Sequence, residues 1–126
     1  MVTEDYVSYE TAKLLKEKGF DGICRTAYET ITNEHAVEQS SISKWGKLGQ
    51  VKRPTLQIVM KWLREKYSLE IYPYHYNPII YNSKWWFEII EYPNSVAEYE
   101  SVKDEEFDTY EEACEAAIKY CLENLV

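Results

Sequence analysis

Aromatic side chains that could stack on a flat ring are concentrated between residues 67 and 92. The nine members of this group are Tyr67, Tyr72, Tyr74, Tyr76, Tyr81, Trp85, Trp86, Phe87 and Tyr92. The alternation over residues 69–76 predicts a strand, in which side chains two positions apart share a face. Tyr72, Tyr74 and Tyr76 then lie about 6.6 Å apart along one face, with Trp86 on the neighbouring strand. If a ligand covers this face, the natural ligand is a nucleotide or another flat ring, because each stacked base contributes about 1–3 kcal/mol.

A basic segment before the second predicted helix could hold the phosphates of such a ligand. Residues 44–66 contain seven basic side chains and a single acidic one, Glu65. Lys47, Lys52 and Arg53 precede the helix, whose N-terminal N–H groups and dipole also favour an anion. The glycine turn around Lys47 lacks the spacing and the GK[ST] ending of a phosphate-binding loop. The segment therefore predicts either an anion site or a charged face that meets only solvent or the acidic end of the chain.

Catalytic and metal chemistry finds less support. His35 and His75 are far apart in sequence, and neither lies near a cysteine at ligand spacing. Cys114 and Cys121 are about 10.5 Å apart along a helix axis, too far to share a disulfide or a metal. No motif places a base beside a serine or cysteine. We expect no cofactor, no metal and no catalysis, with a small hydrolase that uses His75 or the carboxylates of residues 98–112 as the remaining enzymatic alternative.

Length, charge and cysteine content limit the class of protein. The 126 residues suffice for one domain with a core, and no apolar run approaches the ~20 residues of a membrane span. The N-terminus is acidic where a signal peptide needs basic and apolar residues. Three sparse cysteines indicate a reducing compartment, and a net charge of −8 disfavours duplex nucleic acid. These features predict a soluble cytoplasmic protein without a membrane or duplex nucleic acid partner.

Three segments with caps and a 3.6-residue apolar period predict the helices that must position these residues. They are residues 9–18, 54–67 and 108–124. Ser8 is suited to be the first N-cap and Gly19 to end that helix at C′. Pro54 is suited to N1 of the second helix. Asp108 is predicted to cap the third helix, with Glu111 at N3.

Three strands are predicted after the second helix, over residues 69–76, 81–92 and about 95–102. Pro73 indicates that the first of them is an edge strand. Residues 20–53 are harder to interpret, since Ile23 and Cys24 could begin a short strand while residues 26–39 have a roughly helical spacing. We expect an α+β fold, in which a small antiparallel sheet packs against two or three helices. The chain is predicted to form a single domain, 1–126, in which residues 20–53 are a candidate functional segment.

Both faces of the predicted sheet carry apolar residues, which a sheet with one solvated face does not need. If Leu69 and Ile71 point to the core, the tyrosines point away from it. Three explanations stay open: the tyrosine face is covered by residues 20–53, by another subunit, or by a ligand.

Three blocks of the chain resemble short uncharacterised proteins encoded by phages and mobile elements of gut bacteria. They are YETAKLLKEKGFD at residues 9–21, PTLQIVMKWLREKYSLEI at 54–71 and YEEACEAAIKYCLENL at 110–125. The resemblance implies a phage-type accessory protein in a bacterial host and supplies no activity or functional residues.

The sequence and the resemblance together predict a non-catalytic accessory protein. It is expected to bind and sequester a host factor, for example as an inhibitor of host defence, or a small anionic, nucleotide-like ligand. The binding residues would be the aromatic face and the basic segment: Tyr72, Tyr74, Tyr76, Trp86, Lys47, Lys52 and Arg53. The alternative is a structural protein that forms homo-oligomers through the aromatic face.

Overall fold

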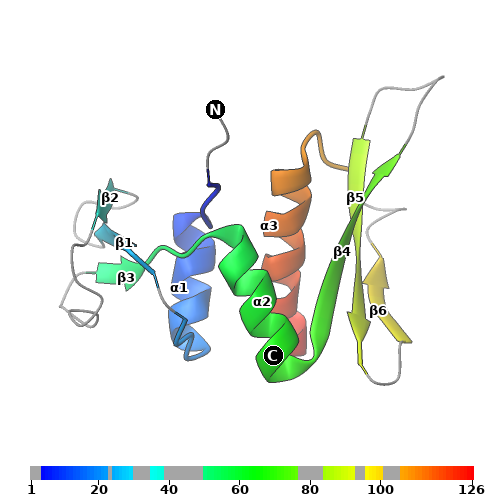
Figure 1. Cartoon of the computed structure of the whole chain (residues 1–126), viewed down its shortest axis with the longest axis horizontal. Helices are drawn as coiled ribbons and strands as arrows, with labels where there is room; N and C mark the ends of the chain where they lie inside the picture. Colours follow the sequence, from blue (N-terminus) through cyan, green and yellow to red (C-terminus); the bar gives the residue numbers. More distant parts are fainter. Residues whose placement is uncertain are drawn as a thin grey trace.

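The computed structural model describes residues 4–22, 24–29, 35–38, 50–76, 84–92, 96–100 and 106–126. Within these ranges, three helices form a layer between two antiparallel sheets of three strands each (Figure 1). The predicted α+β class is confirmed. The sequence predicted one sheet, and the second sheet comes from the segment that was hard to interpret.

The first helix, α1 (Tyr9–Glu17), begins at the predicted residue and ends one residue before the predicted Lys18, which is its C-cap. Ser8 Oγ accepts a hydrogen bond from the Thr11 N–H at 3.3 Å. Gly19 has a φ of 77°, which a residue without a side chain adopts at little cost, and the helix ends there.

The other two helices begin one or two residues later than predicted. In α2 (Leu56–Tyr67) the cap is Thr55, whose hydroxyl accepts from the Ile58 N–H, so Pro54 precedes the cap and is not N1. In α3 (Tyr110–Tyr120) the cap is Thr109, and Asp108 instead donates its N–H to the Glu112 carboxylate. Both corrections have one cause, since a threonine next to the predicted residue supplies the cap hydroxyl. The chain continues from α3 into a π-helical turn over Cys121–Leu125.

The C-terminal sheet follows the prediction closely. Its strands are β4 (Leu69–Tyr76), β5 (Lys84–Glu91) and β6 (Val96–Glu100), in the order β4-β5-β6. The edge position inferred from Pro73 is therefore confirmed. Leu69, Ile71, Phe87 and Ile89 are all buried, and α2 and α3 pack on this side of the sheet.

The N-terminal sheet was not predicted. Its strands are β1 (Thr26–Glu29), β2 (His35–Glu38) and β3 (Gln50–Lys52), in the order β2-β1-β3. The helical spacing of residues 26–39 was misleading, because the backbone of β1 pairs with β2 on one side and β3 on the other. The sheet packs beside α1, on the side of the helical layer away from β4–β6 (Figure 1). The described parts of residues 20–53 therefore do not cover the tyrosine face.

One hydrophobic cluster runs through the three layers, from Val51 in β3 through Leu15, Leu63 and Ile118 of the helices to Phe87 in β5. It fixes both sheets against the helices. None of the helices in the described ranges has the length and apolarity needed to cross a membrane.

Candidate functional site

The aromatic residues singled out by the sequence lie on the side of the C-terminal sheet that faces away from the helices. We call this side the outer face and define it by Glu70, Tyr72 and Tyr74 of β4 and Trp86, Glu88 and Ile90 of β5. These positions alternate with the buried residues of the same strands. The register pairs Tyr74 with Trp86 and Tyr72 with Glu88, so the structure brings these rings together. The side chain of Tyr76 lies outside the described residues.

The two tyrosine rings of the outer face are held by hydrogen bonds while remaining partly accessible. Tyr74 is 40% exposed and donates its hydroxyl proton to Glu88 Oε1 at 3.1 Å. The hydroxyls of Tyr72 and Tyr92 share a short hydrogen bond, which raises the pKa of Tyr72 to about 12. The Tyr72 phenol therefore stays neutral at physiological pH.

The charges around the outer face are predominantly acidic. Glu70 and Glu88 lie on it, and two basic side chains that reach it already have carboxylate partners. Arg64 Nη1 lies 3.4 Å from Glu70 Oε1, and Lys84 pairs with Asp108. A phosphate placed here would meet carboxylates and compete for these two cations.

The basic residues predicted to accompany the tyrosines lie elsewhere. Lys52 and Arg53 belong to the N-terminal sheet and its exit, on the opposite side of the helical layer (Figure 1). Lys52 Nζ donates to the Gly22 carbonyl at 3.1 Å. The Arg53 guanidinium stacks over Tyr6, 3.9 Å from the ring centroid. The structure thus separates these cations from the outer face, and Lys47 lies outside the described residues.

The N-terminus of α2, considered in the sequence as an anion site, uses its donors within the fold. The Leu56 N–H donates to the Asp5 carbonyl at 2.9 Å, and the Ile58 N–H donates to the Thr55 hydroxyl at 3.2 Å. These two contacts reduce what the helix end offers to an anion.

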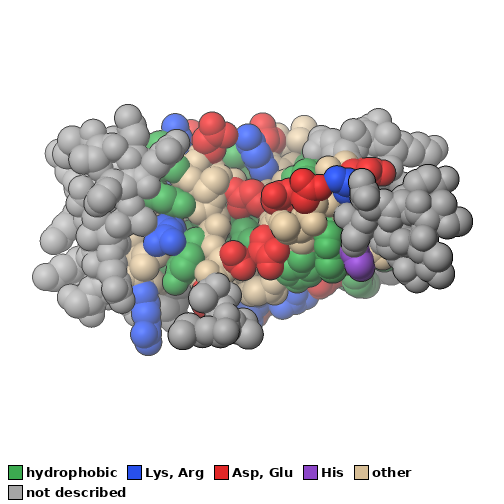
Figure 2. All heavy atoms as spheres, turned by 90° about the horizontal axis from the view of Figure 1, so that it is seen from above, with side chains coloured by type: hydrophobic (Ala, Val, Ile, Leu, Met, Phe, Trp, Pro, Cys, Tyr) green, Lys and Arg blue, Asp and Glu red, His purple; other side chains and the backbone are tan. Residues whose placement is uncertain are grey.

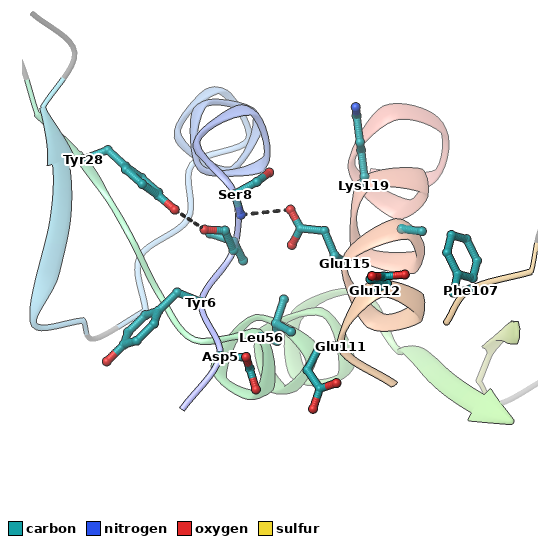
Figure 3. Close-up of a pocket in the computed structure, with 12 residues that line it drawn as sticks. Asp5, Tyr6, Ser8, Tyr28, Leu56, Phe107, Glu111, Glu112, Glu115 and Lys119 are labelled. Carbon is teal, nitrogen blue, oxygen red and sulfur yellow. Dashed lines mark hydrogen bonds between the residues drawn. The ribbon is translucent and has the colours of Figure 1, made fainter. Parts of the chain in front are cut away.

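A cavity open to solvent, which the sequence did not predict, lies at the end of the helical layer where all three helices begin, and Figure 3 shows the residues that line it. It has a volume of about 550 Å³ and is bordered by the segment before α1 and by α3. Four carboxylate residues line it: Asp5, Glu111, Glu112 and Glu115. Seen from this end, acidic side chains gather over the middle of the molecule (Figure 2).

Glu115 connects α3 to α1 beside this cavity. Its Oε1 accepts hydrogen bonds from the Ser8 N–H at 2.9 Å and from the Thr11 hydroxyl at 2.7 Å. Its Oε2 is buried and has no hydrogen-bond partner among the described residues. The one residue in the sequence that indicates this contact is Thr11, a polar residue on the apolar side of α1. It is fully buried and needs a hydrogen-bond partner.

The described residues contain no group of three His, Cys, Asp or Glu side chains arranged to hold a metal ion. The fold and the two surfaces define an α+β protein with a helical layer between two small sheets. No protein-family model, curated protein or solved structure matches the chain.

Proposed function

We propose that the protein is a non-catalytic, phage-type accessory protein that binds and sequesters a host protein in the cytoplasm of a bacterial cell. The outer face is the binding surface. The observation that carries this proposal is the position of Tyr72, Tyr74 and Trp86, which are large rings that the helical layer does not bury.

Aromatic residues in this setting are typical of protein interfaces. Tyr and Trp bury a large area and have few torsions to immobilise, and they are enriched among residues that dominate binding energy. The hydroxyl contacts of Tyr72 and Tyr74 hold the rings before a partner arrives, which lowers the entropy lost on binding. A preorganised aromatic patch on a small protein therefore supports a role in capture.

The charge of the outer face favours a neutral or basic partner surface. Glu70 and Glu88 lie among the rings, and the whole chain has a net charge of −8. An acidic patch attracts basic partners over a distance and speeds their association.

A host protein explains the outer face better than a nucleotide-like anion does. Lys52 and Arg53 lie beside the other sheet, and Arg64 and Lys84 are paired with carboxylates. Phosphates on the outer face would therefore find little neutralisation. A nucleotide and a second copy of the chain are the two alternative occupants that the experiment below distinguishes.

The test compares three tagged single variants purified from a bacterial host. Trp86→Ala and Tyr74→Ala remove rings of the outer face, while Ile58→Ala removes an apolar side chain of α2 that is 38% exposed and lies off this face. We expect a host protein to co-purify in fixed ratio with wild type and with Ile58→Ala. Its affinity should fall at least about tenfold for the two ring variants, as expected for central interface residues.

Equal affinity of all three variants for that host protein would contradict the proposal. If the purified wild type carries only a nucleotide, or only a second copy of itself, that molecule and not a host protein is the occupant of the outer face.

A further inference from the structure

We propose that the outer face recognises an arginine side chain of its protein partner, whose guanidinium binds at Glu88. This inference rests on the proposed function, because it names the chemical group by which a host protein is held on the outer face. The site consists of Glu88 and the three aromatic rings that lie next to it.

The strand register places the rings around this carboxylate. Tyr72 lies directly opposite Glu88 on β4, and Trp86 lies two positions before it on β5, on the same side of the sheet. Tyr74 lies diagonally across, and its hydroxyl donates to Glu88 Oε1 at 3.1 Å. Tyr74 is 40% exposed, and Glu88 and Trp86 are partly exposed. A side chain from outside can therefore contact the carboxylate and the rings together.

The charge of Glu88 has no basic partner among the described residues. The other carboxylate of the outer face, Glu70, is paired with Arg64 at 3.4 Å. Within the described ranges Glu88 contacts a neutral group instead, the Tyr74 hydroxyl, and only its Oε1 is used. The centre of the aromatic surface thus carries a negative charge that the fold described here does not balance.

A partner that covers the rings also covers Glu88. Removing water from a carboxylate is strongly unfavourable unless a cation or hydrogen-bond donors replace that water. A wholly apolar or an acidic partner surface would therefore lose at Glu88 much of the free energy that it gains on the rings. A partner with a cation at this point gains at both, and the charge pair also fixes how the two surfaces are aligned.

An arginine suits the site better than a lysine. Its planar guanidinium stacks on aromatic rings and is more weakly hydrated than an ammonium group, so it enters an interface more readily. It also donates two parallel hydrogen bonds to one carboxylate. The Glu88 oxygen that accepts from Tyr74 has a second lone pair, so both oxygens can accept from the guanidinium.

The experiment is an NMR titration of the full chain with N-acetyl-arginine methylamide. The matching citrulline derivative has the shape of arginine without its charge, and the matching lysine derivative has the charge without the plane. We expect the arginine derivative to shift the Trp86 indole N–H signal with millimolar affinity and to bind at least about threefold more tightly than either control. Equal binding of the three compounds, or no shift at tens of millimolar, overturns the proposal.

Two matched variants locate the site. Glu88→Gln removes the charge and keeps an oxygen that can accept from the Tyr74 hydroxyl, and we expect it to bind the arginine derivative about fivefold more weakly. Glu65→Gln makes the same charge change at an exposed position of α2, on the inner side of the sheet, and should bind as wild type does. Equal affinity of Glu88→Gln and wild type overturns the proposal.

Co-purification of a host protein distinguishes this inference from the function on which it rests. If Trp86→Ala loses the host protein and Glu88→Gln binds it with wild-type affinity, the outer face is the interface and the arginine inference is wrong. If wild type carries no host protein but prefers the arginine derivative in a way that depends on Glu88, the arginine site stands and the proposed function is wrong.

Discussion

At the scale of single residues, one side-chain contact joins the first and last helices: Thr11 on α1 and Glu115 on α3. Thr11 is fully buried on α1 because its hydroxyl has a carboxylate partner, Glu115, on α3. The sequence places Thr11 within an apolar stripe and Glu115 within an acidic helix. Neither position by itself indicates the other, because they lie 104 positions apart in the sequence. This is why the cavity beside Glu115 could not be predicted.

The three cysteines give a prediction at this scale. Burial raises the pKa of the thiols of Cys24 and Cys114 to about 11 and that of Cys121 to about 12. Each thiol therefore stays protonated at pH 8, where an ordinary cysteine is partly ionised and reactive. We expect the folded protein to resist iodoacetamide at pH 8 and to take up three alkyl groups in denaturant, as measured by mass spectrometry. Rapid alkylation of the folded protein would contradict this account.

At the scale of elements, the sequence predicted the helices and strands whose ends and faces are determined by neighbouring residues. Ser8 and Gly19 lie at the two ends of α1 as expected, and β4 covers the predicted residues. Helix caps and the alternation of a strand can both be recognised within a few residues of sequence. The strands β1 and β2 were missed because residues 26–39 have a roughly helical spacing, although β1 and β2 pair directly. The strand β3, which pairs with the other side of β1, lies more than twenty positions further along the chain. The outer face could be predicted from β4 and β5 alone. Its separation from Lys52 and Arg53 could not, because it depends on where the second sheet packs.

The contact between α1 and α3 gives a prediction about stability. Glu115→Ala removes the acceptor of the Ser8 N–H and of the Thr11 hydroxyl, and leaves the buried Thr11 hydroxyl with Ser8 Oγ, 3.2 Å away, as its remaining partner. We expect a loss of about 1–3 kcal/mol in the free energy of unfolding, measured by urea denaturation. Glu123→Ala, at an exposed position on the same C-terminal segment, is the control and should change little. Equal stability of the two variants would show that the contact contributes nothing to the fold.

At the scale of the whole molecule, the layered arrangement gives the chain two surfaces with different chemistry. The outer face is aromatic and lies on one side of the C-terminal sheet. The cavity is acidic, and acidic side chains gather at the end of the molecule where the three helices begin (Figure 2). Two helices that contribute to the lining of the cavity also pack on the C-terminal sheet, α2 on β4 and α3 on β4 and β5. The outer face lies on the other side of these strands, and a substitution there should leave the cavity intact.

Native mass spectrometry of the protein purified from bacterial cells tests the central claim most directly. The account predicts that wild type carries the mass of one host protein, which is released on denaturation, and that Trp86→Ala purified in the same way lacks it. Wild-type masses that equal whole numbers of this chain alone would contradict the claim. The same host protein bound to Trp86→Ala in equal amount would contradict the outer face as its site.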